Sequence, residues 1–167
     1  MSKARKQYPT IQGLTWHRTD FYSFFVPMDW HRFTWSDGNE GMIFGPDPDD
    51  PYTVFAVDIK DLGTPFTRED MAALAEGFFE SIEQLPGCAI ESREQNAVGN
   101  RLELAAQYTF QEDKAVRKCW VKVFYHQTRQ IAMMARGATP DKYQYWLPWF
   151  YQAMMTARVH SQKPEHL

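Results

Sequence analysis

Alternating apolar and polar residues predict several short β-strands in the first part of the chain. Residues 21–27, with the sequence FYSFFVP, are rich in aromatic and other strand-forming side chains. Two further strands are expected over residues 31–35 and 42–44, separated by turn-forming residues. A fourth is expected over residues 52–60, where apolar residues again occupy every second position.

The alternation is most regular in the second half of the sequence. Residues 102–110 place Leu, Leu, Ala, Tyr and Phe on one face, which predicts a strand with one buried and one wet face. Strands are also expected over residues 116–126 and 131–136. Because short polar links join these three segments, we expect them to form an antiparallel meander.

Apolar residues at intervals of three and four predict two helices. Residues 71–85 carry one apolar stripe, and Thr67 with Asp70 resembles a capping box in front of it. A second helix is expected over residues 140–159. Pro148 lies inside this second pattern and cannot donate a backbone hydrogen bond, so it predicts either a kink or a fresh start of the helix.

The order of elements is strands, helix, strands, helix, which predicts an α+β fold. An antiparallel β-sheet should carry helices packed on its faces. The 167 residues fit one domain of ordinary size. We expect a flexible N-terminal tail over residues 1–15, a single domain over 16–159 and a polar C-terminal tail over 160–167.

Composition adds one unusual feature, an aromatic share of 16 %. Such residues serve either a well-packed core or a binding surface. The net charge is −3 and the Lys and Arg residues are scattered, which argues against binding to nucleic acid. No apolar run is long enough to span a membrane, and residues 1–10 lack an apolar signal region, so a cytoplasmic location is expected.

The motifs of known catalytic, nucleotide-binding and metal-binding sites are missing from the sequence. The five histidines are dispersed, and Cys88 and Cys119 have no histidine at ligand spacing. We therefore expect no cofactor, no metal and no enzymatic activity. Two cysteines could form one disulfide, but nothing in the sequence indicates it.

An acidic loop is a first candidate site. It contains Asp47, Asp49 and Asp50 among three prolines. An EF-hand loop starting at Asp47 would need Gly and Glu where Tyr52 and Asp58 stand, so that match fails. The alternatives are a looser calcium- or partner-binding loop and a solvated turn stiffened by proline.

Aromatic side chains are the second candidate. Most of the aromatic residues, Trp120 and Trp146 among them, follow strand or helix patterns that are typical of a core. Four aromatic residues remain as candidates for binding a partner. They are Trp30 and Trp35 near turns, and Tyr145 and Trp149 on the second helix. Tyr145 and Trp149 lie four residues apart and off the main apolar stripe of that helix, which consists of Tyr143, Trp146, Leu147 and Phe150.

Two segments of the chain resemble a known superfamily. Residues 22–27 followed by Trp30 resemble the "F-S-F-x-x-P-x-x-W" start of the Mog/PsbP-like superfamily, to which DcrB-like bacterial proteins also belong. Gly137, then residues 147–150 and 154–155, resemble its ending. The resemblance implies an antiparallel sheet with helices on its faces, in a group that acts mostly by binding other proteins.

Three hypotheses for function follow. The first is a non-enzymatic protein-binding domain of an adaptor or chaperone-like kind, whose partner is another protein. The second is a carrier of a small molecule or lipid, with an aromatic-lined pocket between sheet and helix. The third is an enzyme of the cone-shaped α+β type, although such folds usually begin with helices. Neither the partner nor the oligomeric state follows from the sequence.

Overall fold

The computed structural model describes residues 9–34 and 41–161. Each predicted strand and both predicted helices have a counterpart among these residues. In chain order the elements are β1 (Leu14–Arg18), β2 (Tyr22–Pro27), β3 (His31–Phe33), β4 (Met42–Gly45), β5 (Val54–Asp61), the 3₁₀ helix η1 (Arg68–Asp70), α1 (Met71–Glu83), β6 (Ala89–Val98), β7 (Arg101–Glu112), β8 (Ala115–His126), β9 (Arg129–Gly137), α2 (Pro140–Thr156) and β10 (Arg158–Val159).

The strands of the described residues form two antiparallel sheets. The large sheet has seven strands in the order β3-β4-β5-β9-β8-β7-β6, and the small sheet has three in the order β1-β2-β10. Strands β7, β8 and β9 pair with their neighbours in sequence, which confirms the predicted meander, and β6 extends it beyond β7. The turn between β7 and β8 has only two residues, Asp113 and Lys114, both with positive φ, as in the tight turns that match the twist of a hairpin.

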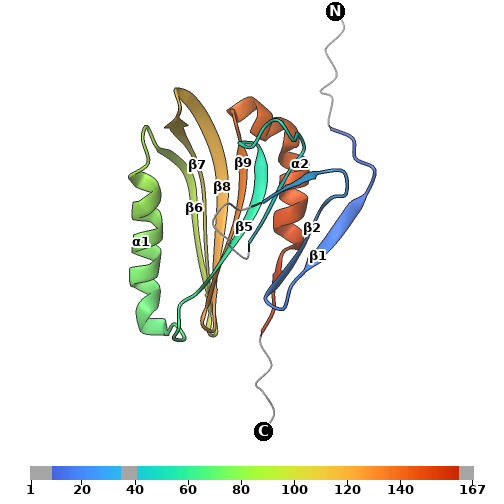
Figure 1. The fold of residues 1–167 in the computed structure, drawn as a ribbon. Coiled ribbons are helices and arrows are strands. Elements are labelled where there is room, and N and C mark those ends of the chain that lie inside the picture. The colour runs from blue at the N-terminus through green and yellow to red at the C-terminus, as the bar shows by residue number, and fades with distance from the viewer. Residues whose placement is uncertain (1–8, 35–40, 162–167) are drawn as a thin grey trace, which may run out of the picture.

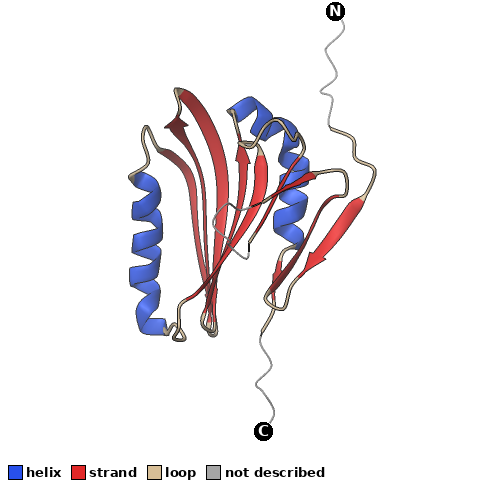
Figure 2. Ribbon diagram, in the orientation of Figure 1, coloured by secondary structure: helices blue, strands red, loops and turns tan. Residues whose placement is uncertain are grey.

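The elements are arranged in layers around the large sheet. Helix α1 covers one face, whereas α2 and the small sheet lie on the other (Figure 1). Figure 2 shows the same layers by secondary structure, with α1 and α2 on opposite sides of the strands. The predicted α+β class, an antiparallel sheet with helices on its faces, is confirmed.

The face beneath α1 is built by the alternation predicted for β7. The five apolar residues of that strand, from Leu102 to Phe110, are all buried and meet the stripe of α1, which includes Ala75 and Ile82. The predicted cap is also present, since the Asp70 carboxylate accepts a hydrogen bond of 2.8 Å from the Thr67 N–H.

The other face is held by aromatic side chains. Phe24 of β2, Phe55 of β5 and Phe150 of α2 are fully buried and join the small sheet, the large sheet and the helix. Gly137 ends β9 where α2 passes closely, because a Cβ at this position would come within 2.6 Å of the Tyr143 Cα. A side chain there would force the helix away from the sheet.

Apart from the short β10, two strands have no counterpart in the sequence prediction. Strand β1 begins at Leu14, two residues before the expected start of the domain. Strand β6 lies between α1 and β7, and its residues are mostly exposed, so apolar residues do not alternate along it. Both are edge strands, whose pairing depends on backbone hydrogen bonds to β2 and β7.

The end of α2 differs from the prediction. The helix stops at Thr156 rather than near residue 159, because Ala157 adopts an extended conformation and β10 then pairs with β2. The His160 N–H donates to the Phe21 carbonyl at 2.8 Å, so the segment expected to be a polar tail begins with a residue bound to the small sheet. The helix is continuous through Pro148, and a fresh start there is not seen.

Replacing Phe150 with alanine is expected to lower the free energy of unfolding by about 3–5 kcal/mol, because this side chain is fully buried among aromatic neighbours. Urea unfolding followed by circular dichroism measures the change. The matched control is Tyr151→Ala at the next position, where the side chain is 55 % exposed and the loss should stay below about 1 kcal/mol. Equal losses in the two variants would contradict the placement of Phe150 in the core.

Candidate functional site

Helix α2 carries a second apolar stripe beside the one that enters the core. Phe150 and Met154 are buried, whereas Leu147, Tyr151 and Met155 recur every four residues on a neighbouring face. Tyr151 and Met155 are 55 % and 44 % exposed. Because residues four apart in a helix lie one above the other, these three side chains form a continuous apolar ridge.

The ridge borders a part of the large sheet that α2 does not cover. The helix packs chiefly on β2, β8 and β9, so β7 and β6 extend beyond it. A groove of about 480 Å³ lies between the ridge and these strands, and we name it the α2 groove. It is lined by Glu94 of β6, Ala105 and Gln107 of β7, Trp120 and Lys122 of β8, and Gln144, Leu147, Pro148, Tyr151 and Met155 of α2.

One wall of the α2 groove is aromatic. The rings of Trp120 and Tyr151 have centroids 6.2 Å apart and planes tilted by 32°. The lysine of the groove already has partners. The Lys122 Nζ lies 3.7 Å from a Glu103 carboxylate oxygen and 5.2 Å from the centre of the Phe124 ring. The groove therefore offers apolar and aromatic surface together with amide groups from Gln107 and Gln144.

A second cavity lies on the same strands, near the turn between β6 and β7. We name it the hairpin pocket; its volume is about 340 Å³. Most of the residues that line it are polar or charged. Its lining residues are Asn96 and Val98 of β6, Asn100 of the turn, Arg101 and Glu103 of β7, and His126 of β8.

Arg101 and His126 are opposite each other in the register of β7 and β8. Arg101 donates from Nη2 to the Val159 carbonyl at 3.2 Å, and the His126 Nε2 is 2.8 Å from the Ser161 hydroxyl. Burial, together with the neighbouring Arg101 guanidinium, lowers the pKa of His126. The hairpin pocket thus holds a permanent cation beside a histidine that is neutral at physiological pH.

The predicted acidic loop folds on itself. The Asp47 carboxylate accepts a hydrogen bond of 2.9 Å from the Asp49 N–H. Asp50 accepts from the Tyr52 N–H at 3.0 Å and from the Thr53 hydroxyl at 2.8 Å, and Lys142 of α2 donates to it at 2.9 Å. These bonds match the alternative of a structured turn, in which Asp50 ties the loop to the first turn of α2.

Asp50 keeps its charge because of these donors. Burial raises the pKa of its carboxyl, but the hydrogen bonds from Lys142, Thr53 and Tyr52 outweigh burial, and the pKa lies below its ordinary value. Among the described residues, no group of three or more His, Cys, Asp or Glu side chains is placed to hold a metal ion.

The same loop is clamped from the sheet by a buried arginine. The Arg117 side chain lies with its Cζ 3.8 Å from the centre of the Tyr52 ring. It donates to the Glu112 carboxylate at 3.0 Å and to the Ala138 carbonyl at 3.1 Å. Arg117 is only 5 % exposed, so its charge is buried and paired. The alternation of the strand does not indicate on which face this side chain lies.

The predicted aromatic candidates have different positions. Trp30 is 7 % exposed and packs edge-to-face on Trp146 and Phe150, which makes it part of the core rather than of an exposed surface. Tyr145 is exposed beside Trp146. Trp149 is partly buried and donates from Nε1 to the Pro9 carbonyl at 3.0 Å, so Tyr145 and Trp149 do not form the exposed pair considered from the sequence.

Two further expectations concern single residues. The candidate Trp35 lies outside the described residues. Cys88 and Cys119 are both free thiols, and burial raises the pKa of Cys119 to about 11. Such a thiol is protonated and unreactive at neutral pH.

Helices long and apolar enough to cross a membrane do not occur in the part of the chain that the structure describes. The cytoplasmic location expected from the sequence stays a prediction.

Comparisons with solved structures identify the fold. The cyanobacterial PsbP (CyanoP) of Synechocystis sp. PCC 6803 superposes with a TM-score of 0.66 at 15 % identity, covering 90 % of this chain and 95 % of that chain. The chain has the PsbP-like fold. LpqN of Mycobacterium tuberculosis, described as involved in cell envelope biogenesis, superposes with a TM-score of 0.58 at 13 % identity, over 84 % of this chain and 83 % of its own.

A third solved structure extends the same fold to another bacterium. A Pseudomonas aeruginosa protein of unknown function superposes with a TM-score of 0.56 at 17 % identity, over 90 % of this chain and 98 % of its own. No protein-family model and no curated protein matches the sequence. The resemblance to the Mog/PsbP-like superfamily is thus confirmed at the level of the fold, which is what such low identities establish.

Sequence reasoning missed most of the α2 groove. Leu147 was expected on the core stripe, Met155 entered only through the family resemblance, and Tyr151 carried no assignment. Their spacing of four residues was the available signal, since it marks a second face on the same helix. Trp120 belonged to the aromatic set, but its position in the groove depends on how far α2 reaches across the sheet.

Asp50→Asn is expected to lower the free energy of unfolding by about 1 kcal/mol at neutral pH, because the amide loses the charge that attracts Lys142. A carboxyl whose folded pKa is depressed contributes stability above its unfolded pKa and loses it as the pH falls through the folded pKa. The difference between the two proteins should therefore shrink below about pH 4.

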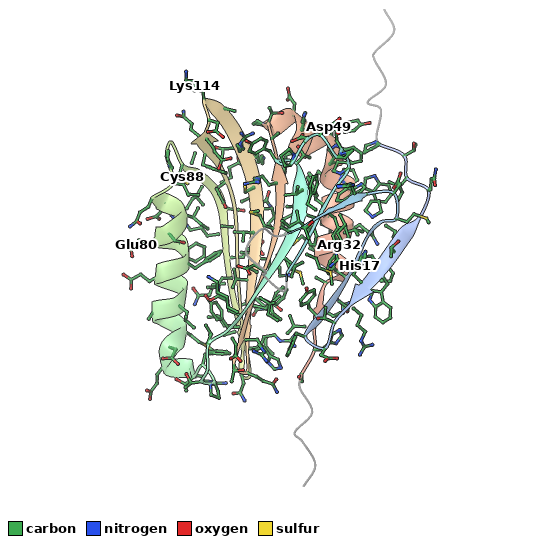
Figure 3. All side chains as sticks on the ribbon, viewed as in Figure 1. His17, Arg32, Asp49, Glu80, Cys88 and Lys114 are labelled. Carbon is green, nitrogen blue, oxygen red and sulfur yellow. The ribbon has the colours of Figure 1, made fainter. Side chains whose placement is uncertain are left out.

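Urea unfolding at a series of pH values measures this difference, with Asp49→Asn as the matched control because that carboxylate faces solvent in the same loop. Figure 3 shows Asp49 at the top of the molecule. A difference that stays constant from neutral to acid pH would mean that the charge of Asp50 does not stabilise the loop.

Proposed function

We propose that this protein is a non-enzymatic protein-binding domain of an adaptor or chaperone-like kind, and that its partner docks in the α2 groove. The observation that carries the proposal is the apolar ridge of Leu147, Tyr151 and Met155, whose last two members are exposed, beside strands that α2 leaves uncovered on this face of the sheet. Exposed apolar side chains that lie together are typical of interaction sites, whereas isolated ones are ordinary.

The composition of the groove favours a protein as the occupant. Tyr and Met are enriched in protein interfaces, and Lys is depleted there. The one lysine of the groove is paired with Glu103, so a partner would not have to strip water from a free cation. The amides of Gln107 and Gln144 can bind the backbone of a partner.

A carrier of a small molecule or lipid is the second candidate, because a volume of about 480 Å³ lies within the range of ligand sites. Two features favour the protein. The space between α2 and the central strands is filled by core side chains such as Phe124 and Phe150. The walls of the groove include Tyr151, more than half exposed, whereas ligand sites enclose most of the ligand surface.

Enzymatic chemistry would need a nucleophile or an acid–base pair in the groove. The titratable side chains that line it are Glu94, Lys122 and Tyr151, and Lys122 is engaged by Glu103. The PsbP-like fold supports the same proposal, because the superfamily that the sequence resembles acts mostly by binding proteins.

Site-specific photo-crosslinking tests the proposed function. The photoreactive residue p-benzoylphenylalanine replaces Tyr151, which lines the groove, and the variant is produced in cells of the source organism. Irradiation is expected to crosslink it to one specific partner protein. Gel electrophoresis and mass spectrometry identify the adduct. The matched control has the same probe at Glu80, on the outer side of α1 (Figure 3), and should give no such adduct.

The competing outcomes are distinct. Equal adducts from both positions, or none at position 151, would count against docking in the groove. A small molecule that co-purifies with the wild-type protein in native mass spectrometry and is lost in Leu147→Glu would favour the carrier instead.

A further inference from the structure

The hairpin pocket and the α2 groove are two ends of one surface. Arg101, Glu103, Ala105 and Gln107 alternate along β7 and therefore point to the same side of the sheet. Arg101 and Glu103 line the hairpin pocket, and Ala105 and Gln107 line the α2 groove. A segment of a partner that lies along β7 would meet both.

Ion pairs neutralise most of the cations on this surface. Lys118 lies 2.9 Å from a Glu91 carboxylate oxygen, and Lys122 lies 3.7 Å from Glu103. Arg101 differs, because no carboxylate among the described residues lies within ion-pair distance of its guanidinium. The Arg101 guanidinium donates a hydrogen bond to the carbonyl of Val159.

The surroundings of Arg101 suit an anion. Asn96 and Asn100 add neutral amide donors to the hairpin pocket. Glu103 also lines the pocket, but Lys122 offsets its charge. A planar guanidinium binds carboxylates in a two-pronged geometry, which gives both affinity and orientation.

The opposite charge lies farther along the surface. Glu94 lines the α2 groove, pairs in register with Ala105 and has no ion-pair partner among the described residues. Ala105 is four residues beyond Arg101, about 13 Å along an extended strand, and Gln107, opposite Trp120, is about 20 Å away. The surface is therefore positive at one end and apolar with a negative rim at the other.

We propose that the partner segment is an extended peptide with an Asp or Glu carboxylate bound at Arg101 and with apolar side chains, four to six residues away, packed against Tyr151 and Met155. The inference rests on the proposed function and specifies the chemistry of the partner. Glu94 fixes the direction of the peptide, because a peptide bound in reverse would bring its acidic group next to this carboxylate.

Selection from a displayed library of random dodecapeptides on the full chain tests this inference. Enriched peptides are expected to carry an acidic residue four to six positions from a pair of apolar or aromatic residues. Binding of each enriched peptide is then measured by fluorescence anisotropy. Arg101→Gln should weaken it about tenfold, because the carboxylate loses its charge-assisted hydrogen bonds.

The peptides supply a control that does not depend on folding of a variant. Changing the acidic residue of an enriched peptide to its amide should weaken binding to the wild-type protein about tenfold, and the amide peptide should no longer distinguish wild type from Arg101→Gln. Arg93→Gln is the matched protein control. Arg93 lies on β6 but pairs with Glu83 of α1 on the other side of the sheet, so binding should not change.

The outcomes separate this inference from the proposed function. Peptides that require Tyr151 but carry no acidic residue, or bind equally to Arg101→Gln, would overturn the acidic anchor and leave the groove intact. A selection whose peptides are all insensitive to Tyr151→Ala, or one that yields no binders, would count against both.

Discussion

A seven-stranded sheet with apolar residues on both faces must be covered on both sides, and the rest of this structure follows from how that is done. Helix α1 covers one face with a single stripe. The other face is shared by α2 and a three-stranded sheet, joined through Phe24, Phe55 and Phe150. Because both covering elements lie over the β5, β8 and β9 side, β6 and β7 remain open there. The candidate site is the border of this incomplete cover.

Elements with one buried face could be predicted from the sequence, whereas strands held mainly by pairing at sheet edges could not. The alternation in β7 and the stripe of α1 each reflect one buried face, so both were predicted correctly. Strands β1 and β6 are held mainly by backbone hydrogen bonds at sheet edges, which leave little trace in side-chain type. The end of α2 depends on pairing between β10 and β2, at opposite ends of the chain.

The same distinction explains the candidate residues. Trp30 stands near a turn, as many surface residues do, but α2 folds over it and buries it. Trp149 is off the core stripe, yet the chain before β1 covers it at Pro9. Asp50 could be recognised as a loop residue, whereas its bond to Lys142 joins residues that only the fold brings together. A site formed by several elements depends on the relative positions of those elements, which local spacing does not encode.

The position of β6 at the end of the large sheet has a consequence for solubility. One side of this strand pairs with β7, and its other side presents backbone N–H and C=O groups to which another chain could add. The strand carries Glu91, Arg93 and Glu94 near its centre, where an incoming strand would have to bury or displace their charges. The polar sequence of β6, which lacks the alternation by which strands are predicted, thus also protects the protein from edge-to-edge aggregation.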